Sequence, residues 1–105
     1  MKIGIGIALG VMLVVPALQS AVAQTAADVY KTKCQSCHGA DGMATTAMGK
    51  TLKVRPISDP SVKRISEAAM IEAVKNGMGK MQPYKDKLSD AEIKESIVRF
   101  RSFMK

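Results

Sequence analysis

The sequence predicts an all-α domain of three or more short helices joined by long loops. Three observations support this prediction. Apolar residues recur at the three- and four-residue spacing of helices, serines stand where helix N-caps are favoured, and no segment shows the alternation of a convincing strand. The chain has 105 residues, which is enough for one domain.

The core that such helices can form is short of aromatic side chains. The chain has two Tyr, two Phe and no Trp, but eight Met. Aromatic side chains normally supply large blocks of buried area. Long loops in so small a domain suggest that they wrap around something, and a bound group would supply the missing interior.

The first segment, residues 1–23, has the pattern of a secretory signal peptide. Lys2 provides the positive start, Ile3–Leu18 is an apolar run, and Ala21–Ala23 gives the small-x-small cleavage pattern. We expect cleavage there, which leaves residues 24–105 as the mature domain. The alternative is an uncleaved membrane anchor, but the apolar run is shorter than the roughly 20 residues that a span needs. The sequence therefore predicts a periplasmic or secreted protein without stable membrane insertion.

The N-terminal half of the mature chain is predicted to hold one helix followed by loops. Ala26–Lys33 places Val29 and Tyr30 at helical spacing, with Asp28 near the start. Cys34–Gly42 is expected to be rich in turns. Residues 43–60 contain two Pro and few periodic signals, so we predict a loop with room for one helical turn.

The C-terminal half is predicted to hold two helices with clear boundaries. Ser66–Asn76 has Ser66 as N-cap and is followed by Gly77, a favoured residue after a helix end. A loop over Gly77–Leu88 follows. Ser89-Asp90-Ala91-Glu92 is a capping box that begins the last helix. The apolar face of that helix consists of Ile93, Ile97, Phe100 and Met104.

The segment Cys34-Gln35-Ser36-Cys37-His38 is C-x-x-C-H, the attachment motif of c-type haem. Two thiols three residues apart on a helical turn can reach the two vinyl groups of one porphyrin. His38 is then held beneath the ring, where its imidazole can ligate the iron. Three alternatives stay open: a structural disulfide in an oxidising compartment, a thioredoxin-like redox pair, which expects a βαβ context, and a chance match. A four-ligand zinc site is excluded, because the chain has only two Cys and one His.

Several further segments follow this motif in a fixed order. They are Gly39 with Asp41-Gly42, a helix ending in Asn76-Gly77, the loop Gly79–Tyr84, the helix start Lys85–Ile93, and the closing Phe100–Phe103. In this combination the chain resembles the small bacterial monohaem class I cytochromes c, of the c6, c-551 and c-553 kind. The resemblance implies a class I cytochrome c fold around one covalently bound haem c. It also implies that the first and last helices cross.

The resemblance implies that Met81 is the second axial ligand beside His38. Met78 and Met81 both lie in a loop that can cross the far face of the ring, and Met81 falls where the family has its ligand, so Met78 is expected to point away. The other methionines are expected to pack in the core or lie at the surface. The family usually has Met-Pro, whereas here Gln82 separates Met81 from Pro83. The family also often has a Pro whose carbonyl accepts a hydrogen bond from the ligand His, and none lies between His38 and Arg55.

The predicted walls of the haem site are apolar and aromatic. They are Tyr30, Leu52, Ile71, Val74, Tyr84, Leu88, Ile97 and Phe100.

Two strong axial ligands leave no open position on the iron, so the predicted function is one-electron transfer between respiratory-chain donors and an oxidase or reductase, not enzymatic catalysis. The alternative function is a haem sensor or gas-binding module with a labile sixth ligand.

The formal net charge is +7, and removal of Lys2 with the signal peptide lowers it to +6. A basic carrier is steered to redox partners with acidic docking faces. An exported chain without a nucleic-acid motif is not expected to bind nucleic acid, and we expect a monomer. The lysines expected around the haem edge are Lys31, Lys33, Lys50, Lys53, Lys80, Lys85 and Lys87.

Overall fold

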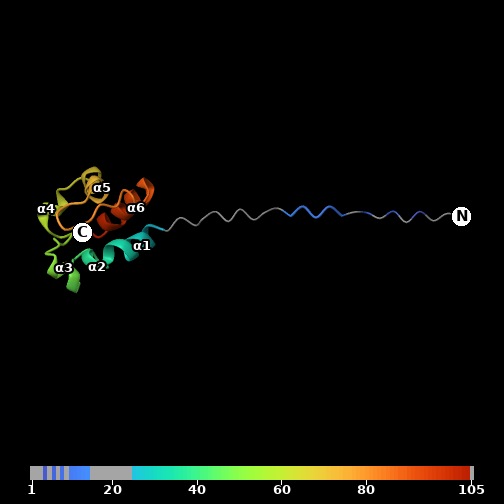
Figure 1. Cartoon of the computed structure of the whole chain (residues 1–105). Helices are drawn as coiled ribbons and strands as arrows, with labels where there is room; N and C mark the ends of the chain where they lie inside the picture. Colours follow the sequence, from blue (N-terminus) through green and yellow to red (C-terminus); the bar gives the residue numbers. More distant parts are fainter. Residues whose placement is uncertain (1–3, 5, 7, 9, 15–24, 105) are drawn as a thin grey trace.

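The computed structural model describes residues 4, 6, 8, 10–14 and 25–104, and over 25–104 its regular elements are helical (Figure 1). An isolated β-bridge pairs Met78 with Met81, and no longer strand occurs in this part of the chain. The prediction of an all-α domain is confirmed. The helical elements are α1 (Ala26–Val29), η1 (Tyr30–Cys34), α2 (Gln35–His38), α3 (Ala47–Thr51), α4 (Pro60–Lys63), α5 (Glu67–Asn76) and α6 (Asp90–Arg101).

The first helix is longer than the sequence predicted. α1, η1 and α2 follow one another without a gap, so helical structure runs through the C-x-x-C-H segment to His38. The expectation that the chain is rich in turns from Cys34 onward is wrong for these residues. η1 is a π-helical turn, a rare geometry that often occurs at functional sites. Gly39 ends the helix with φ +83, which a residue with a Cβ rarely adopts.

The segment 43–60 contains one short helix, and a second begins at its end. Thr46 caps α3 by accepting a hydrogen bond from the Gly49 amide, and this helix fits the single turn that was predicted. α4 was not predicted. Asp59 caps it by accepting from the Ser61 amide, and Pro60 occupies its first turn, where a missing N–H has no cost.

The two C-terminal helices begin where the sequence predicted. Ser66 accepts from the Ala69 amide at the start of α5. At the start of α6, Ser89 accepts from the Glu92 amide at 3.1 Å and Glu92 accepts from the Ser89 amide at 3.0 Å. The predicted capping box is therefore confirmed. α6 ends at Arg101, so Met104 lies beyond the helix and not on its apolar face.

Loss of this cap is expected to destabilise the domain. Ser89→Ala removes the acceptor of the Glu92 amide and should lower the free energy of unfolding by about 1 kcal/mol. Denaturant unfolding measures the change. Lys94→Ala, at an exposed position of α6, is the control and should change stability by no more than about 0.5 kcal/mol. Equal stability of the Ser89→Ala and Lys94→Ala variants would contradict the prediction.

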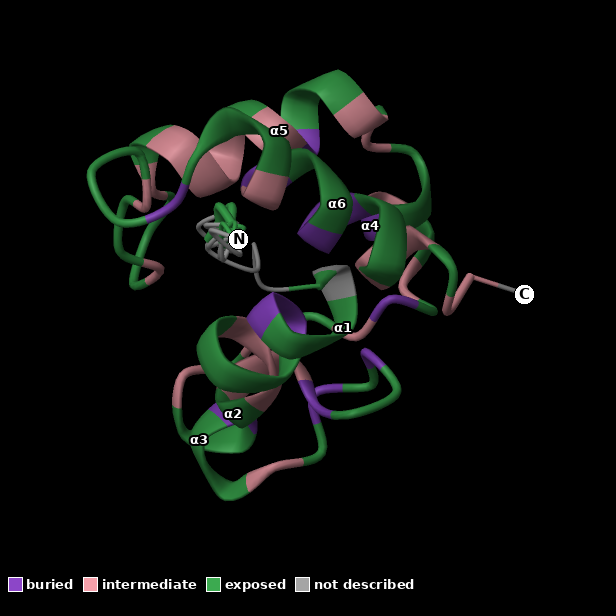
Figure 2. Cartoon of the chain, turned by 90° about the vertical axis from the view of Figure 1, so that its right-hand side faces the viewer, coloured by how far each residue is buried: buried purple, intermediate pink, exposed green. Residues whose placement is uncertain are grey.

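α6 packs against both α1 and α5, and the core lies between them (Figure 2). The aromatic rings of Tyr30 and Phe100 lie 6.4 Å apart, so the first and last helices meet as the resemblance implied. The buried residues form two clusters, and Ile71 and Val74 of α5 pack against both. One cluster consists of Ile57, Val62, Met70 and Ile97, and the other of Val29, Leu88 and Ile93.

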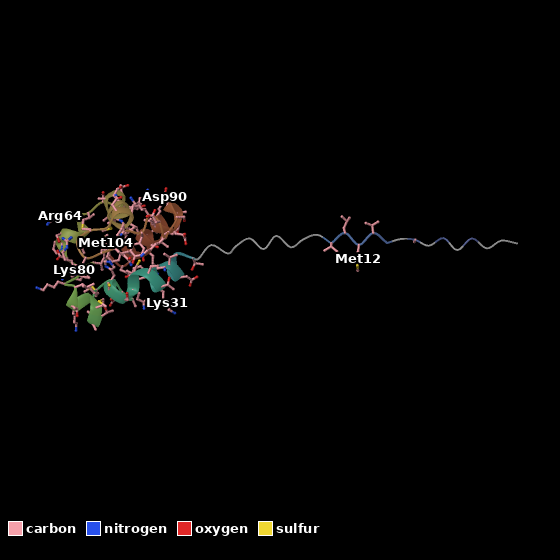
Figure 3. All side chains as sticks on the ribbon, in the orientation of Figure 1. Met12, Lys31, Arg64, Lys80, Asp90 and Met104 are labelled. Atoms are coloured by element: carbon pink, nitrogen blue, oxygen red, sulfur yellow. The ribbon has the colours of Figure 1, made fainter. Side chains whose placement is uncertain are left out.

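The predicted cleavage site at residues 21–24 lies outside the described residues. Residues 11–14 are described without regular secondary structure, and their apolar side chains, such as that of Met12, are exposed (Figure 3). None of the described helices has both the length and the apolar character needed to cross a membrane.

Candidate functional site

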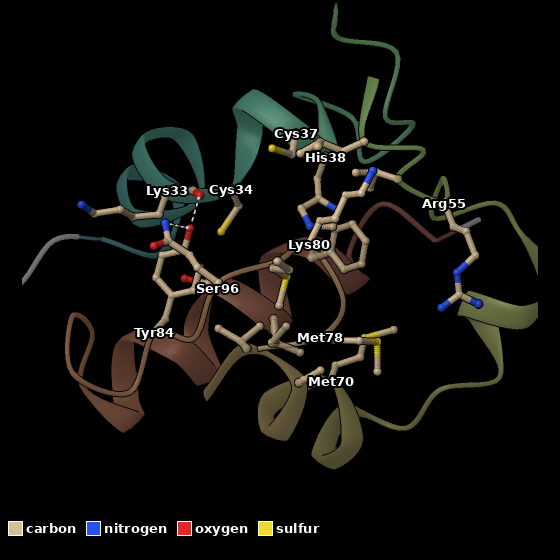
Figure 4. Close-up of a pocket in the computed structure, with 18 of the residues that line it drawn as sticks. Lys33, Cys34, Cys37, His38, Arg55, Met70, Met78, Lys80, Tyr84 and Ser96 are labelled. Atoms are coloured by element: carbon tan, nitrogen blue, oxygen red, sulfur yellow. Dashed lines mark hydrogen bonds between the residues drawn. The ribbon is translucent and has the colours of Figure 1, made fainter. Parts of the chain in front are cut away.

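A cavity of about 560 Å³ lies between the C-x-x-C-H helix and the C-terminal half of the chain (Figure 4). Its walls come from η1 and α2, the segment 48–55, α5, the loop 78–84 and α6. Most of the lining is apolar. Seven of the eight predicted wall residues line it: Tyr30, Leu52, Val74, Tyr84, Leu88, Ile97 and Phe100. Ile71 is not among the lining residues and packs against both core clusters.

Both cysteines line this cavity as free thiols (Figure 4). The structure therefore contains no disulfide between Cys34 and Cys37. Burial, and secondarily the neighbouring Cys37, raises the pKa of the Cys34 thiol to about 11, so this thiol is protonated at neutral pH. The helical turn places the two sulfur atoms on the same cavity, as attachment to one flat ring requires.

His38 ends α2, and its imidazole lines the same cavity. The ring packs edge-on against Phe100, with the ring centroids 5.1 Å apart. Burial lowers the pKa of His38, so the imidazole is neutral at neutral pH, the form that binds metals. Its Nδ1 atom is buried, and no atom of the described residues forms a hydrogen bond with it. No carbonyl of the described residues therefore takes the place of the family's proline carbonyl as its partner.

Hydrogen bonds hold the turn that follows His38. The Ala44 amide donates to the His38 carbonyl at 2.9 Å. The Tyr30 hydroxyl donates to the Gly39 carbonyl at 2.6 Å. Burial raises the pKa of Tyr30, so its hydroxyl stays protonated and keeps donating. These bonds hold the backbone at His38 and Gly39, while the imidazole itself packs against Phe100.

Met81 lines the cavity and is half-buried, as expected of a ligand candidate. Met78 lines the cavity as well, although its side chain is 58% exposed. Met78 was expected to point away from the iron, and its place in the cavity wall was not predicted. The available signal was Gly79-Lys80, a glycine-first pair of the kind that forms two-residue hairpin turns and so pairs residues 78 and 81.

The remaining methionines differ in where they lie. Met70 is buried in the core and also lines the cavity, and its sulfur accepts from Nη1 of Arg101 at 3.8 Å. Met48 lines the cavity from α3, which packs against α2. Met43 and Met104 line a separate cavity of about 250 Å³.

Four cationic residues line the main cavity, and none of its lining residues is Asp or Glu. The four are Lys33, Lys53, Arg55 and Lys80. Arg55 is held in place because its Nη1 donates to Ser61 Oγ at 2.8 Å, and Ser61 Oγ donates to Asp59 Oδ1 at 2.7 Å. Arg55 was missed by the sequence reasoning, although a cation between Val54 and Pro56 in an apolar loop was the available signal.

Tyr84 joins the loop 78–84 to two other walls of the cavity. Its amide donates to the Val74 carbonyl at 2.9 Å, which anchors the loop to α5. Its hydroxyl donates to the Lys33 carbonyl at 3.2 Å and accepts from Gln82 Nε2 at 3.3 Å (Figure 4). Tyr84 thus attaches the loop at two points, to α5 and to η1, and a bond within the loop adds to these.

The lining fits a haem. Two thiols and a neutral imidazole line one apolar cavity, and methionine thioethers line it from another segment of the chain. The cations of the lining, which contains no carboxylate, are available to pair with two propionates. These features define a c-type cytochrome. The chain belongs to the family described as "Cytochrome C oxidase, cbb3-type, subunit III", which matches residues 21–100.

Solved structures agree with this family. The chain is 31% identical to "KustC0563 c-type cytochrome", with a TM-score of 0.70 over 78% of this chain and 100% of that one. It is 29% identical to cytochrome c6C from Synechococcus sp. PCC 7002, with a TM-score of 0.56 over 75% and 93% of the two chains. Cytochrome c6 from the diatom Phaeodactylum tricornutum, at 24% identity and a TM-score of 0.54 over 73% and 88%, supports the fold. The comparison with curated proteins gave no significant match.

The chain therefore has the class I cytochrome c fold, and its cofactor is a covalently bound c-type haem. It is an electron-carrier haem protein of this class.

Proposed function

We propose that this protein is a one-electron carrier whose haem is attached through Cys34 and Cys37 and whose iron is ligated by His38 and Met81. The observation that carries the proposal is the convergence of these four side chains on one cavity. When bound, the haem supplies an iron that changes between the ferrous and ferric states. A His/Met ligand pair favours the ferrous state and gives a comparatively high potential.

Each residue has a separate role in this proposal. The sulfur atoms of Cys34 and Cys37 form thioether bonds with the two vinyl groups. The neutral imidazole of His38 would ligate the iron through one nitrogen, and Met81 Sδ would supply the second ligand atom. Arg55 and Lys53 would pair with the propionates, because both are cations and the cavity lining contains no carboxylate.

Electron transfer is favoured over catalysis because the lining offers donors for both axial positions. It includes no second imidazole and no carboxylate to act as general acid or base. The apolar walls and anchored loop also suit a reaction in which only the oxidation state changes. A haem sensor or gas-binding module remains the second candidate, because Met78 and Met81 stand in a loop whose tip is exposed.

The visible spectrum of the reduced holoprotein, before and after CO, tests this proposal. His/Met ligation should give a low-spin ferrous spectrum that CO changes little. The ferric protein should show the weak far-red band of sulfur-to-iron charge transfer. A high-spin ferrous spectrum that shifts at once on addition of CO would favour the sensor instead.

We further propose that residues 1–23 are removed on export and that residues 24–105 act in the periplasm or outside the cell. The C-x-x-C-H segment supports this, because c-type haem is attached outside the cytoplasm. N-terminal sequencing of the purified protein should find residue 24, to within one residue, as the first residue. A protein that keeps residues 1–23 and partitions with membranes would contradict this.

Docking to an acidic partner should depend on salt. The mature chain carries +6, from +7 less Lys2, before the haem propionates are counted. Three of the proposed docking lysines, Lys33, Lys53 and Lys80, line the cavity. The second-order rate of electron transfer to an acidic redox partner should fall as the salt concentration rises from about 10 to 200 mM, because the Debye length shrinks from about 30 to under 10 Å. Stopped-flow kinetics measure this. A rate that stays constant over the same range would mean that the lysines are only a solvated surface.

A further inference from the structure

Met78 and Met81 form a directly opposed pair in a small hairpin. The Met81 amide donates to the Met78 carbonyl at 2.9 Å, and the Met78 amide donates to the Met81 carbonyl at 3.1 Å. Side chains of a directly opposed antiparallel pair lie on the same face, with Cβ atoms about 5 Å apart. A hairpin that presents Met81 to the cavity therefore presents Met78 as well, in agreement with the lining.

The turn between the two methionines fixes this pairing. Gly79 has φ +57, whereas Lys80 has no positive φ. A glycine with positive φ at the first central position is the signature of a two-residue type II′ hairpin. The sequence Met-Gly-Lys-Met thus encodes a turn that sets two thioethers side by side.

The hairpin is tight at its base and open at its tip. A Cβ on Gly77 would lie 2.9 Å from the Met81 carbonyl oxygen and 3.0 Å from the Pro83 nitrogen, so the strands are close-packed there. A Cβ on Gly79 would meet no atom within 4 Å. Met78 is 58% exposed, so little packing restricts its three rotatable side-chain bonds.

The other two methionines at the cavity are less suited to the far side of the ring. The Met70 sulfur is engaged by Arg101, and the residue is part of the core. Met48 belongs to α3, which packs against α2 and therefore lies on the His38 side. Met78 alone among them shares a backbone pairing with Met81.

On the basis of the proposed haem site, we propose that Met78 is a reserve axial ligand. When the bond between Met81 Sδ and the iron breaks, Met78 Sδ donates its lone pair to the iron instead. One dative bond replaces another, and neither electrons nor protons are transferred. The hairpin therefore keeps a thioether on the iron, and keeps the iron low-spin, after the bond to Met81 is lost.

Variants that remove one or both thioethers test this directly. The variants are Met81→Leu, Met81→Ala, Met78→Leu and the double variant Met78→Leu/Met81→Leu. Met43→Leu, at the separate smaller cavity, is the matched control. Leucine keeps the volume and removes the sulfur, so at least one of the two Met81 variants should accumulate as holoprotein. The measurements are the far-red band of the ferric protein, CO affinity of the ferrous protein, and NMR of methionine methyl groups, which ring currents shift when the residue ligates the iron.

The expected result is that Met81→Leu and Met81→Ala keep the band and a ring-current-shifted methyl, now assigned to Met78. Both should bind CO at least about tenfold more weakly than the double variant, because a competing ligand leaves only a fraction of the sites open. Met78→Leu, which keeps Met81, and the control Met43→Leu should keep the wild-type spectrum. The double variant should lose the band and retain covalent haem.

Two results would overturn the inference. In the first, Met81→Leu or Met81→Ala loses the band and binds CO as tightly as the double variant. In the second, Met78→Leu alone loses the band, which would make Met78 the primary ligand. Failure of the proposed function looks different, because the wild-type protein itself would then lack the band or carry no covalent haem.

Discussion

Replacing both Cys34 and Cys37 with alanine is expected to abolish covalent attachment of haem. Both thiols line the cavity and neither is engaged in a disulfide, so they are the groups available to bond with the two vinyls. The protein isolated from an export-competent host should show no haem staining after denaturation. Each single alanine variant keeps one sulfur and should retain at most one thioether bond, visible as a shifted absorption maximum.

Ser36→Ala is the control for this experiment. Ser36 lies between the two cysteines and lines the cavity, but it offers no thiol. It should carry the wild-type amount of denaturation-resistant haem. If covalent haem persists in the double cysteine variant, Cys34 and Cys37 are not the residues that attach the haem.

Gly49→Ala is expected to cause a large loss of stability. Gly49 is buried in α3, and a Cβ there would collide with the carbonyl oxygen of Cys37 and lie 2.7 Å from that of Ala44. Both are backbone atoms, so α3 must move away from the attachment helix. Such overpacking costs about 1–3 kcal/mol, and we expect the upper end of that range.

Denaturant unfolding of the holoprotein and the yield of haem per chain measure the effect. Lys50→Ala, at the next and exposed position of α3, is the control and should match the wild type. If Gly49→Ala has the same free energy of unfolding as the wild type, α3 and α2 are not packed as closely as the structure shows.

Local signals in the sequence predicted the ends of the long helices well. Ser66 and Ser89 are N-caps because each hydroxyl accepts a hydrogen bond from the amide three residues later. Such a short-range contact depends on only a few neighbouring residues, so it can be predicted from the sequence. The helix α4 carried the same kind of signal, Asp59 followed by Pro60, but four residues are too few to show an apolar period. The π-helical turn from Tyr30 to Cys34 has no comparable sequence signature.

The candidate site was predictable in its chemistry and less so in its surroundings. The spacing of Cys34, Cys37 and His38 specified the attachment segment, since all three lie within one helical turn. The cavity-facing position of Met78 was missed, because it depends on the φ angle of Gly79 and a pairing across the turn. Arg55 was missed as well, because its fixed position depends on Ser61, which belongs to a helix that the sequence did not reveal.

The hydrogen bond from the Tyr84 amide to the Val74 carbonyl has a consequence for the motions of this domain. Because this bond joins the loop to α5, detachment of the loop exposes the Tyr84 amide to solvent exchange. Hydrogen–deuterium exchange at this one amide therefore reports how often the loop opens as a unit. We expect it to exchange faster than the Ile97 amide in the middle of α6, whose exchange requires opening of the last helix. Equal exchange rates at the two amides would mean that the loop and α6 form a single cooperative unit, so the loop would open only when the whole domain unfolds.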